Sequence, residues 1–103
     1  MTDITVRDNP DQHRFEASVD GHFAGFAEYM IANKLIIFTH TEVDPAFEGQ
    51  GVGSALVRDA LDAVRADGTR EVMPLCPFVK LWIQRHPEYR DLVFAPQPSN
   101  VKD

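Results

Sequence analysis

A chain of 103 residues, 44% of them hydrophobic, is long enough for one globular domain with a single core. Sixteen acidic and ten basic residues give a net charge of −6, and the basic residues form no run, so nucleic acid and anionic membranes are not expected partners. One cysteine excludes an internal disulfide and a cysteine-rich zinc site, and four scattered histidines predict no metal site.

The first part of the chain is predicted to form an antiparallel meander. Asn9-Pro10 indicates a turn over residues 8–11. From Arg14, apolar residues alternate with polar ones and predict a half-buried strand, which Asp20-Gly21 ends in a two-residue hairpin. Residues 23–30 then return as a second strand.

A third strand and the first helix follow. Residues 35–43 are rich in β-branched side chains and form the segment most typical of a strand. The period then changes, because Val52, Leu56, Ala60 and Val64 recur every four residues and predict an amphipathic helix. Gly68 is placed to end that helix in the left-handed conformation.

The last predicted elements are one strand and one helix. Residues 70–76 read as a strand in which Pro74 favours an edge position. Pro77 suits the first position of a helix, and His86-Pro87 ends it. Because a helix joins the strands at 35–43 and 70–76, these strands should be parallel. The predicted fold class is α+β: a mixed sheet with an antiparallel meander, a parallel β-α-β unit and a second helix.

The organisation of the chain is predicted to be simple. We expect residues 1–95 to form one domain and the polar, proline-rich residues 96–103 to be a flexible C-terminal tail. Residues 1–4 lack the features of a signal peptide, and no apolar stretch approaches the roughly 20 residues that cross a bilayer. These observations predict a cytoplasmic protein.

A glycine-rich segment, residues 49–53, lies between the third strand and the first helix. Three glycines in this segment let the backbone turn sharply and approach a ligand closely, and a helix start offers free N–H groups to a phosphate. The spacing departs from the dinucleotide fingerprint, and the lysine of a Walker loop is absent. A turn that only caps the helix is the alternative reading.

The motif Gln50-x-x-Gly53-x-Ala55 resembles the Arg/Gln-x-x-Gly-x-Gly/Ala signature of the GNAT superfamily of N-acetyltransferases. Further similarity at residues 74–79 and 86–89 extends the resemblance to short GNAT-like proteins, over most of residues 14–94. The resemblance implies a minimal GNAT-like fold that binds acetyl-CoA and moves its acetyl group to an amine acceptor. The implied acetyl-CoA-binding residues are Val43, Gln50, Gly51, Val52, Gly53, Ser54 and Ala55.

Three side chains are candidates for catalysis. In the GNAT fold the two parallel strands splay apart and pantetheine enters the gap, which would bring His40, Glu42 and Cys76 near the thioester. His40 and Glu42 alternate onto one face of their strand and could act as a base, or could form an exposed pair without a role. Cys76 precedes Pro77 and is expected at the N-cap, where a thiolate is stabilised; a buried small hydrophobe is the alternative.

The acceptor side is where this chain departs from larger GNAT enzymes, which carry two helices between their first two strands. The hairpin at Asp20-Gly21 leaves no room for such helices. Two functions therefore stay open: an N-acetyltransferase with an unknown amine acceptor, and a non-catalytic acyl-CoA-binding module or sensor.

Overall fold

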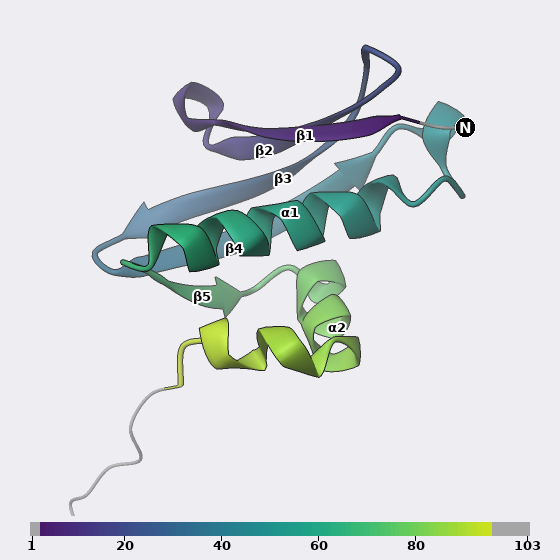
Figure 1. Cartoon of the computed structure of the whole chain (residues 1–103). Coiled ribbons are helices and arrows are strands. Elements are labelled where there is room, and N and C mark those ends of the chain that lie inside the picture. Colours follow the sequence, from purple (N-terminus) through teal and green to yellow (C-terminus); the bar gives the residue numbers. More distant parts are fainter. Residues whose placement is uncertain (1–2, 96–103) are drawn as a thin grey trace, which may run out of the picture.

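The computed structural model describes residues 3–95, and the predicted flexible tail at 96–103 lies outside them. Over this range the chain forms a five-stranded sheet, two α-helices and three short 3₁₀ helices (Figure 1). In chain order these are β1 (Ile4–Asn9), η1 (Pro10–Gln12), β2 (Arg14–Val19), β3 (His22–Ala32), β4 (Leu35–Val43), η2 (Pro45–Phe47), α1 (Val52–Asp67), β5 (Glu71–Pro74), α2 (Pro77–Arg85) and η3 (Pro87–Leu92).

The strands lie in the sheet in the order in which they occur in the chain. β1 to β4 pair antiparallel, and β5 pairs parallel to β4 after the crossover through α1. The prediction of a mixed sheet with a meander and a parallel β-α-β unit is therefore confirmed. β5 is an edge strand, which is the position that Pro74 favours because proline has no N–H for a ladder.

The strand β1 is absent from the sequence-based prediction. Its alternation of apolar and polar residues is weak. Ile4 and Val6 pack partly against the core, but the next position on the same face is the polar residue Asp8. β1 gains its place through pairing with β2 along the register from Ile4↔Val19 to Asn9↔Arg14. The strand is thus fixed by tertiary pairing rather than by its own pattern.

The turns follow the predicted chemistry. Asp20 and Gly21 both have positive φ, at 49° and 85°, as a two-residue hairpin between right-twisted strands requires. Gly68 ends α1 in the left-handed conformation, and its N–H donates to Val64 O. The predicted strand at 70–76 is shorter in the structure, because the last paired residue of β5 is Pro74.

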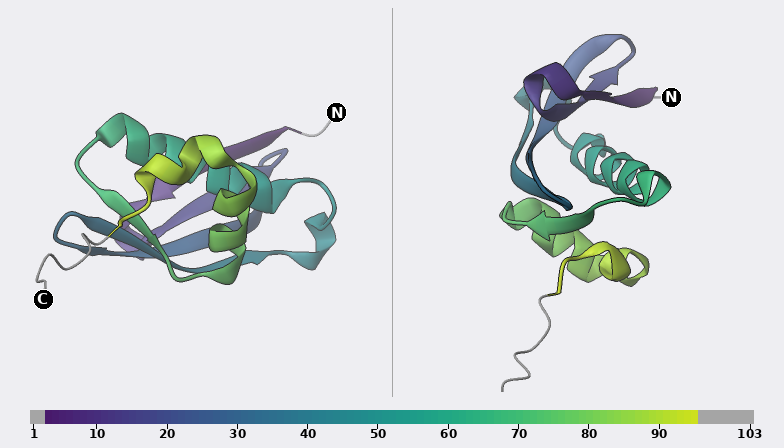
Figure 2. Two further views of the ribbon diagram at one scale, coloured as in Figure 1. Left: turned by 90° about the horizontal axis from the view of Figure 1, so that it is seen from below. Right: turned by 90° about the vertical axis from the view of Figure 1, so that its left-hand side faces the viewer.

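One face of the sheet packs on α1, around which the strands curve (Figure 2). The core joins Phe15, Tyr29 and Phe38 of the sheet to Leu56 and Leu61 of α1. α2 and η3 lie beyond β5 in the views of Figures 1 and 2, and Val79, Trp82 and Tyr89 extend the same core. Among the described residues, no helix combines the length and apolar character needed to traverse a bilayer.

The parallel strands separate halfway along β4. The β4–β5 ladder ends at Phe38↔Pro74, while β4 continues to Val43. There the chain turns into α2, and the N–H groups of Leu75 and Cys76 both donate to Phe38 O, at 3.0 and 2.8 Å. The second half of β4 therefore has no β5 residue beside it among residues 3–95.

Candidate functional site

The glycine-rich segment forms a tight turn onto the start of α1. Gly49 and Gly51 have φ values of +83° and +85°, a region that side chains disfavour. Gly51 is the N-cap and carries no capping side chain, and the first intrahelical bond there runs from Ala55 N to Gly51 O at 3.0 Å. The N–H groups of residues 52–54 precede that bond, so they are available to an anion at the positive end of the helix dipole.

A pocket opens between this turn, the second half of β4 and the start of α2. It holds about 340 Å³ and is lined mainly by apolar groups and backbone. The lining residues are Thr41, Val43, Phe47, Glu48, Gly49, Gly51, Val52, Gly53, Ser54 and Phe78.

Gly53 is needed for a reason that the sequence does not reveal. Its φ is not in the left-handed region, because Gly53 is already inside α1. A Cβ at this position would lie 2.9 Å from Cζ of Phe78 and 3.6 Å from Cγ2 of Val43. The missing side chain makes room for the Phe78 ring, which is 43% exposed and forms one wall of the pocket.

Ser54 links the first turn of α1 to α2. Trp82 Nε1 donates to Ser54 Oγ at 2.8 Å, and the Trp82 ring stacks on His86 with centroids 3.7 Å apart. Since the serine oxygen accepts from the indole, its own proton is free to point toward a ligand. His86 Nδ1 lies 2.7 Å from Trp82 O, so His86 holds the end of α2.

Cys76 lies at the N-cap of α2, as predicted, but its side chain makes no capping hydrogen bond. The thiol is buried, and Sγ lies 3.4 Å from Oγ1 of Thr41, a residue of the pocket wall. Cys76 therefore lies directly behind the wall of the pocket, where β4 and β5 separate.

His40 and Glu42 form an exposed pair on β4, with His40 Nε2 3.0 Å from Glu42 Oε1 and side chains 56% and 64% exposed. A bulge explains their orientation: Glu28 pairs with His40 but Tyr29 pairs with Phe38, so Thr39 is an extra residue. The bulge turns Thr41 inward with the buried Phe38 and leaves His40 and Glu42 outward. The predicted cluster of His40, Glu42 and Cys76 is thus divided between the two faces of β4.

The structure brings together most, but not all, of the residues expected to bind acetyl-CoA. Val43, Gly51, Val52, Gly53 and Ser54 line the pocket, whereas Gln50 is exposed on the turn and Ala55 lies one residue deeper in α1. The sequence analysis missed the wall residues Thr41, Phe47, Glu48 and Phe78. Among the described residues, no group of three or more His, Cys, Asp or Glu side chains could hold a metal ion.

Comparisons with known proteins agree with this fold. The structure is similar to a GCN5-like putative N-acetyltransferase from Staphylococcus aureus, with a TM-score of 0.66, 19% identity and 96% of each chain covered. A ribosomal-protein-alanine N-acetyltransferase from Brucella melitensis biovar Abortus 2308 gives a TM-score of 0.59 at 15% identity, with 99% of this chain and 97% of that one covered.

A third similar structure is the longer ribosomal-protein-S18-alanine N-acetyltransferase from Escherichia coli, with a TM-score of 0.55 and 19% identity. The match covers 70% of this chain and 64% of that enzyme, so the chain spans less than two thirds of its length. The comparison with curated proteins gave no match. At sequence level, residues 14–92 match the GCN5-related N-acetyl-transferase family, and the chain therefore belongs to that family.

Proposed function

We propose that this protein is an N-acetyltransferase that uses acetyl-CoA as the acetyl donor and an amine as the acceptor. The observation that carries the proposal is the glycine turn at the start of α1, which opens into a pocket at the point where β4 and β5 separate. The family assignment supports the same reaction class.

The residues present fit the two ends of acetyl-CoA. The free N–H groups of Val52, Gly53 and Ser54 suit the pyrophosphate, and the Gln50 side chain is exposed beside them. The pocket wall formed by Val43 and Phe78 suits the pantetheine arm. The edge of β4 beyond Phe38 has no β5 partner among residues 3–95, so its backbone is available to the amides of that arm.

Acetyl-CoA supplies an activated thioester carbonyl, and little further chemistry is required of the protein. The acceptor amine must be held deprotonated against that carbonyl, and the leaving thiolate must be protonated. The exposed His40–Glu42 pair is our candidate for receiving the amine proton, either directly or through water. Cys76 is the candidate for protonating the leaving thiolate, since it lies against Thr41 of the pocket wall.

A non-catalytic acyl-CoA-binding module is the second candidate, and one observation favours it. β1 and β2 are joined only by η1 and His13. This connection, rather than the hairpin at Asp20-Gly21, joins the first two strands, and it contains no α-helix that could form a wall of an acceptor site. We also propose a location in the cytoplasm, a reducing compartment, and this location is compatible with either function.

Two measurements separate these functions. Calorimetric titration with acetyl-CoA and with free CoA should give saturable binding, and no binding of either would overturn both candidates. Incubation with acetyl-CoA and a panel of primary amines should then release CoA together with an acetylated product seen by mass spectrometry. Tight binding without product from any amine would favour the module.

The residue assignments need their own variants. Glu42→Gln and Cys76→Ala should lower turnover while leaving acetyl-CoA affinity unchanged. Glu28→Gln, an exposed carboxylate on the neighbouring strand, is the matched control for Glu42. Unchanged turnover in Glu42→Gln and His40→Ala would remove this pair from the mechanism.

A further inference from the structure

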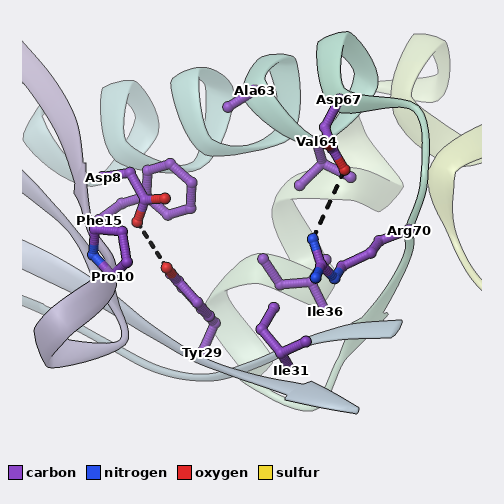
Figure 3. Close-up of a pocket in the computed structure, with 10 residues that line it drawn as sticks. All are labelled: Asp8, Pro10, Phe15, Tyr29, Ile31, Ile36, Ala63, Val64, Asp67 and Arg70. Carbon is purple, nitrogen blue, oxygen red and sulfur yellow. Dashed lines mark hydrogen bonds and ion pairs between the residues drawn. The ribbon is translucent and has the colours of Figure 1, made fainter. Parts of the chain in front are cut away.

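A second pocket lies at the other end of α1, and no step of the proposed reaction uses it. It is bounded by the C-terminal half of α1, the inner face of the sheet and the start of β5, and it holds about 320 Å³ (Figure 3). We call it the distal pocket and define it by six of its lining residues: Asp8, Phe15, Tyr29, Ile36, Val64 and Arg70. Val64 is eleven residues along α1 from Gly53, or about 16 Å at the helical rise.

The two ends of the distal pocket carry different charged groups: Asp8 lies at one end, and Arg70 with its ion-pair partner Asp67 lies at the other. Asp8 is in β1 and Arg70 directly precedes β5, and these strands form opposite edges of the sheet. Figure 3 shows Asp8 beside Tyr29 on one side of the pocket and Arg70 on the other, where Ile36 and Val64 flank it and a dashed line joins it to Asp67. The pocket is thus a partly apolar cavity with a carboxylate at one end and an ion-paired guanidinium at the other.

The carboxylate end is held in place by Tyr29. Tyr29 OH donates to Oδ1 of Asp8 at 2.7 Å, and the second carboxylate oxygen takes no part in that bond. A bond donated by a neutral phenol leaves the carboxylate its charge. An ammonium group is the natural partner for this free oxygen.

The guanidinium end contains an unsatisfied donor. Among the described residues, Nε of Arg70 is buried and has no hydrogen-bond partner. Asp67, which also lines the pocket, forms a long ion pair with Arg70, with 3.7 Å between Oδ2 and Nη1, a distance beyond hydrogen-bond range. A buried donor without a partner is costly, and a ligand carboxylate that displaced Asp67 and bound the guanidinium edge would remove that cost.

We propose that the distal pocket binds an ω-amino acid: a short apolar chain with an ammonium at one end and a carboxylate at the other. The ammonium would meet Asp8, the carboxylate would take the place of Asp67 beside Arg70, and the chain would cover Ile36 and Val64. An α-amino acid fits less well, because its two charges are adjacent whereas those of the pocket lie on opposite sides. The proposal uses no residue of the glycine turn and does not depend on acetyl transfer.

The test uses 5-aminopentanoate, with pentanoate and pentylamine as analogues that lack one charge. Titration of the whole protein followed by amide NMR should give saturable shifts at residues of the distal pocket. Pentanoate and pentylamine should each bind about tenfold more weakly or worse, as expected for the loss of one charge-assisted hydrogen bond. Saturation with acetyl-CoA should not displace 5-aminopentanoate.

Three variants locate the binding site. Asp8→Asn and Arg70→Gln should each weaken 5-aminopentanoate by about tenfold or more. Asp8→Asn keeps an acceptor for Tyr29 and so keeps the fold. Asp11→Asn, an exposed carboxylate on η1 outside the pocket, is the matched control and should change nothing. The proposal is overturned by an absence of saturable shifts, by equal binding of either single-charge analogue, or by shifts confined to the glycine turn.

Discussion

Gly53 and Phe78 form a pair in which the absence of one side chain creates the place for the other. The aromatic ring is held against the first turn of α1 only because position 53 has no Cβ. This explains why the glycine is needed although its backbone conformation is available to any residue. It also means that Gly53 acts on the pocket through a neighbour.

Gly53→Ala is therefore expected to alter binding without unfolding the protein. The new methyl would lie 2.9 Å from Cζ of Phe78, which is exposed enough to swing aside into the pocket. We expect acetyl-CoA affinity to fall by about tenfold, or about 1.4 kcal/mol, in calorimetry. In a Phe78→Ala background, the further change Gly53→Ala should lower acetyl-CoA affinity only slightly, because the ring that the methyl would displace is absent. If the double variant recovers nothing, the ring is not the cause.

Gly25 presents the opposite case, in which the neighbour cannot move. A Cβ at Gly25 would lie 2.4 Å from the backbone oxygen of Glu42, on the strand that pairs with it. We expect Gly25→Ala to lower the free energy of unfolding by about 1–3 kcal/mol, as overpacking does, in urea denaturation. Ser18→Ala on the adjacent strand should stay within about 0.5 kcal/mol. An equal stability of Gly25→Ala and the parent would contradict the close strand approach.

At the level of single residues, the sequence was informative where the backbone itself sets the requirement. The turn at Asp20-Gly21 and the helix end at Gly68 both require positive φ, and the residue types at these positions indicate that requirement directly. The separation of His40 and Glu42 from Cys76 could not be predicted, because it depends on the bulge at Thr39. A bulge reverses the alternation on which any assignment of strand faces rests.

One hydrogen bond couples the two helices beside the pocket, and a second joins η3 to α1. Trp82 of α2 donates to Ser54 in the first turn of α1, and Tyr89 of η3 donates to Asp62 of α1 at 2.8 Å. Both bonds lie at the margin of the core, where the donors are attached to buried rings. The position of α2 relative to the glycine turn is therefore fixed by α1 itself.

A double-mutant cycle on Trp82→Phe and Ser54→Ala should show this coupling. Each single variant removes the same 2.8 Å bond, so each should lower the free energy of unfolding, and the double variant should not add the two losses. We expect a coupling free energy of about 1 kcal/mol from urea denaturation. Additive losses would mean that the bond contributes nothing to the contact between the helices.

At the level of elements, the predictions worked where periodicity is strong. α1, α2 and the strands β2 to β4 were placed to within a few residues, since each presents a regular apolar face. β1 was missed because Asp8 occupies an inward position, and that position is explained by the distal pocket and by its bond to Tyr29. A polar residue on an inward face is the signal that could have indicated a second pocket.

On the scale of the molecule, two tyrosine–aspartate bonds within residues 3–95 connect distant segments to the core. Tyr29 on β3 donates to Asp8 on β1, and Tyr89 after α2 donates to Asp62 on α1. Burial, the bond to Asp8 and the charge of Asp8 raise the pKa of Tyr29, while the charge of Arg70 acts in the opposite direction. The bond to Asp62, followed by burial, raises the pKa of Tyr89.

The raised tyrosine pKa values predict a loss of stability at alkaline pH. A group with a raised pKa in the folded state contributes stability that is present below its unfolded pKa, about 10 for tyrosine, and is lost as the pH rises above it. We therefore expect the urea midpoint of the parent to fall progressively as the pH rises from about 10 upward. Tyr29→Phe, which cannot ionise, should start with a lower midpoint at neutral pH but decline less over that range. Tyr89→Phe is the companion variant. Parallel declines in the parent and Tyr29→Phe would show that the bond between β1 and β3 does not carry this pH dependence.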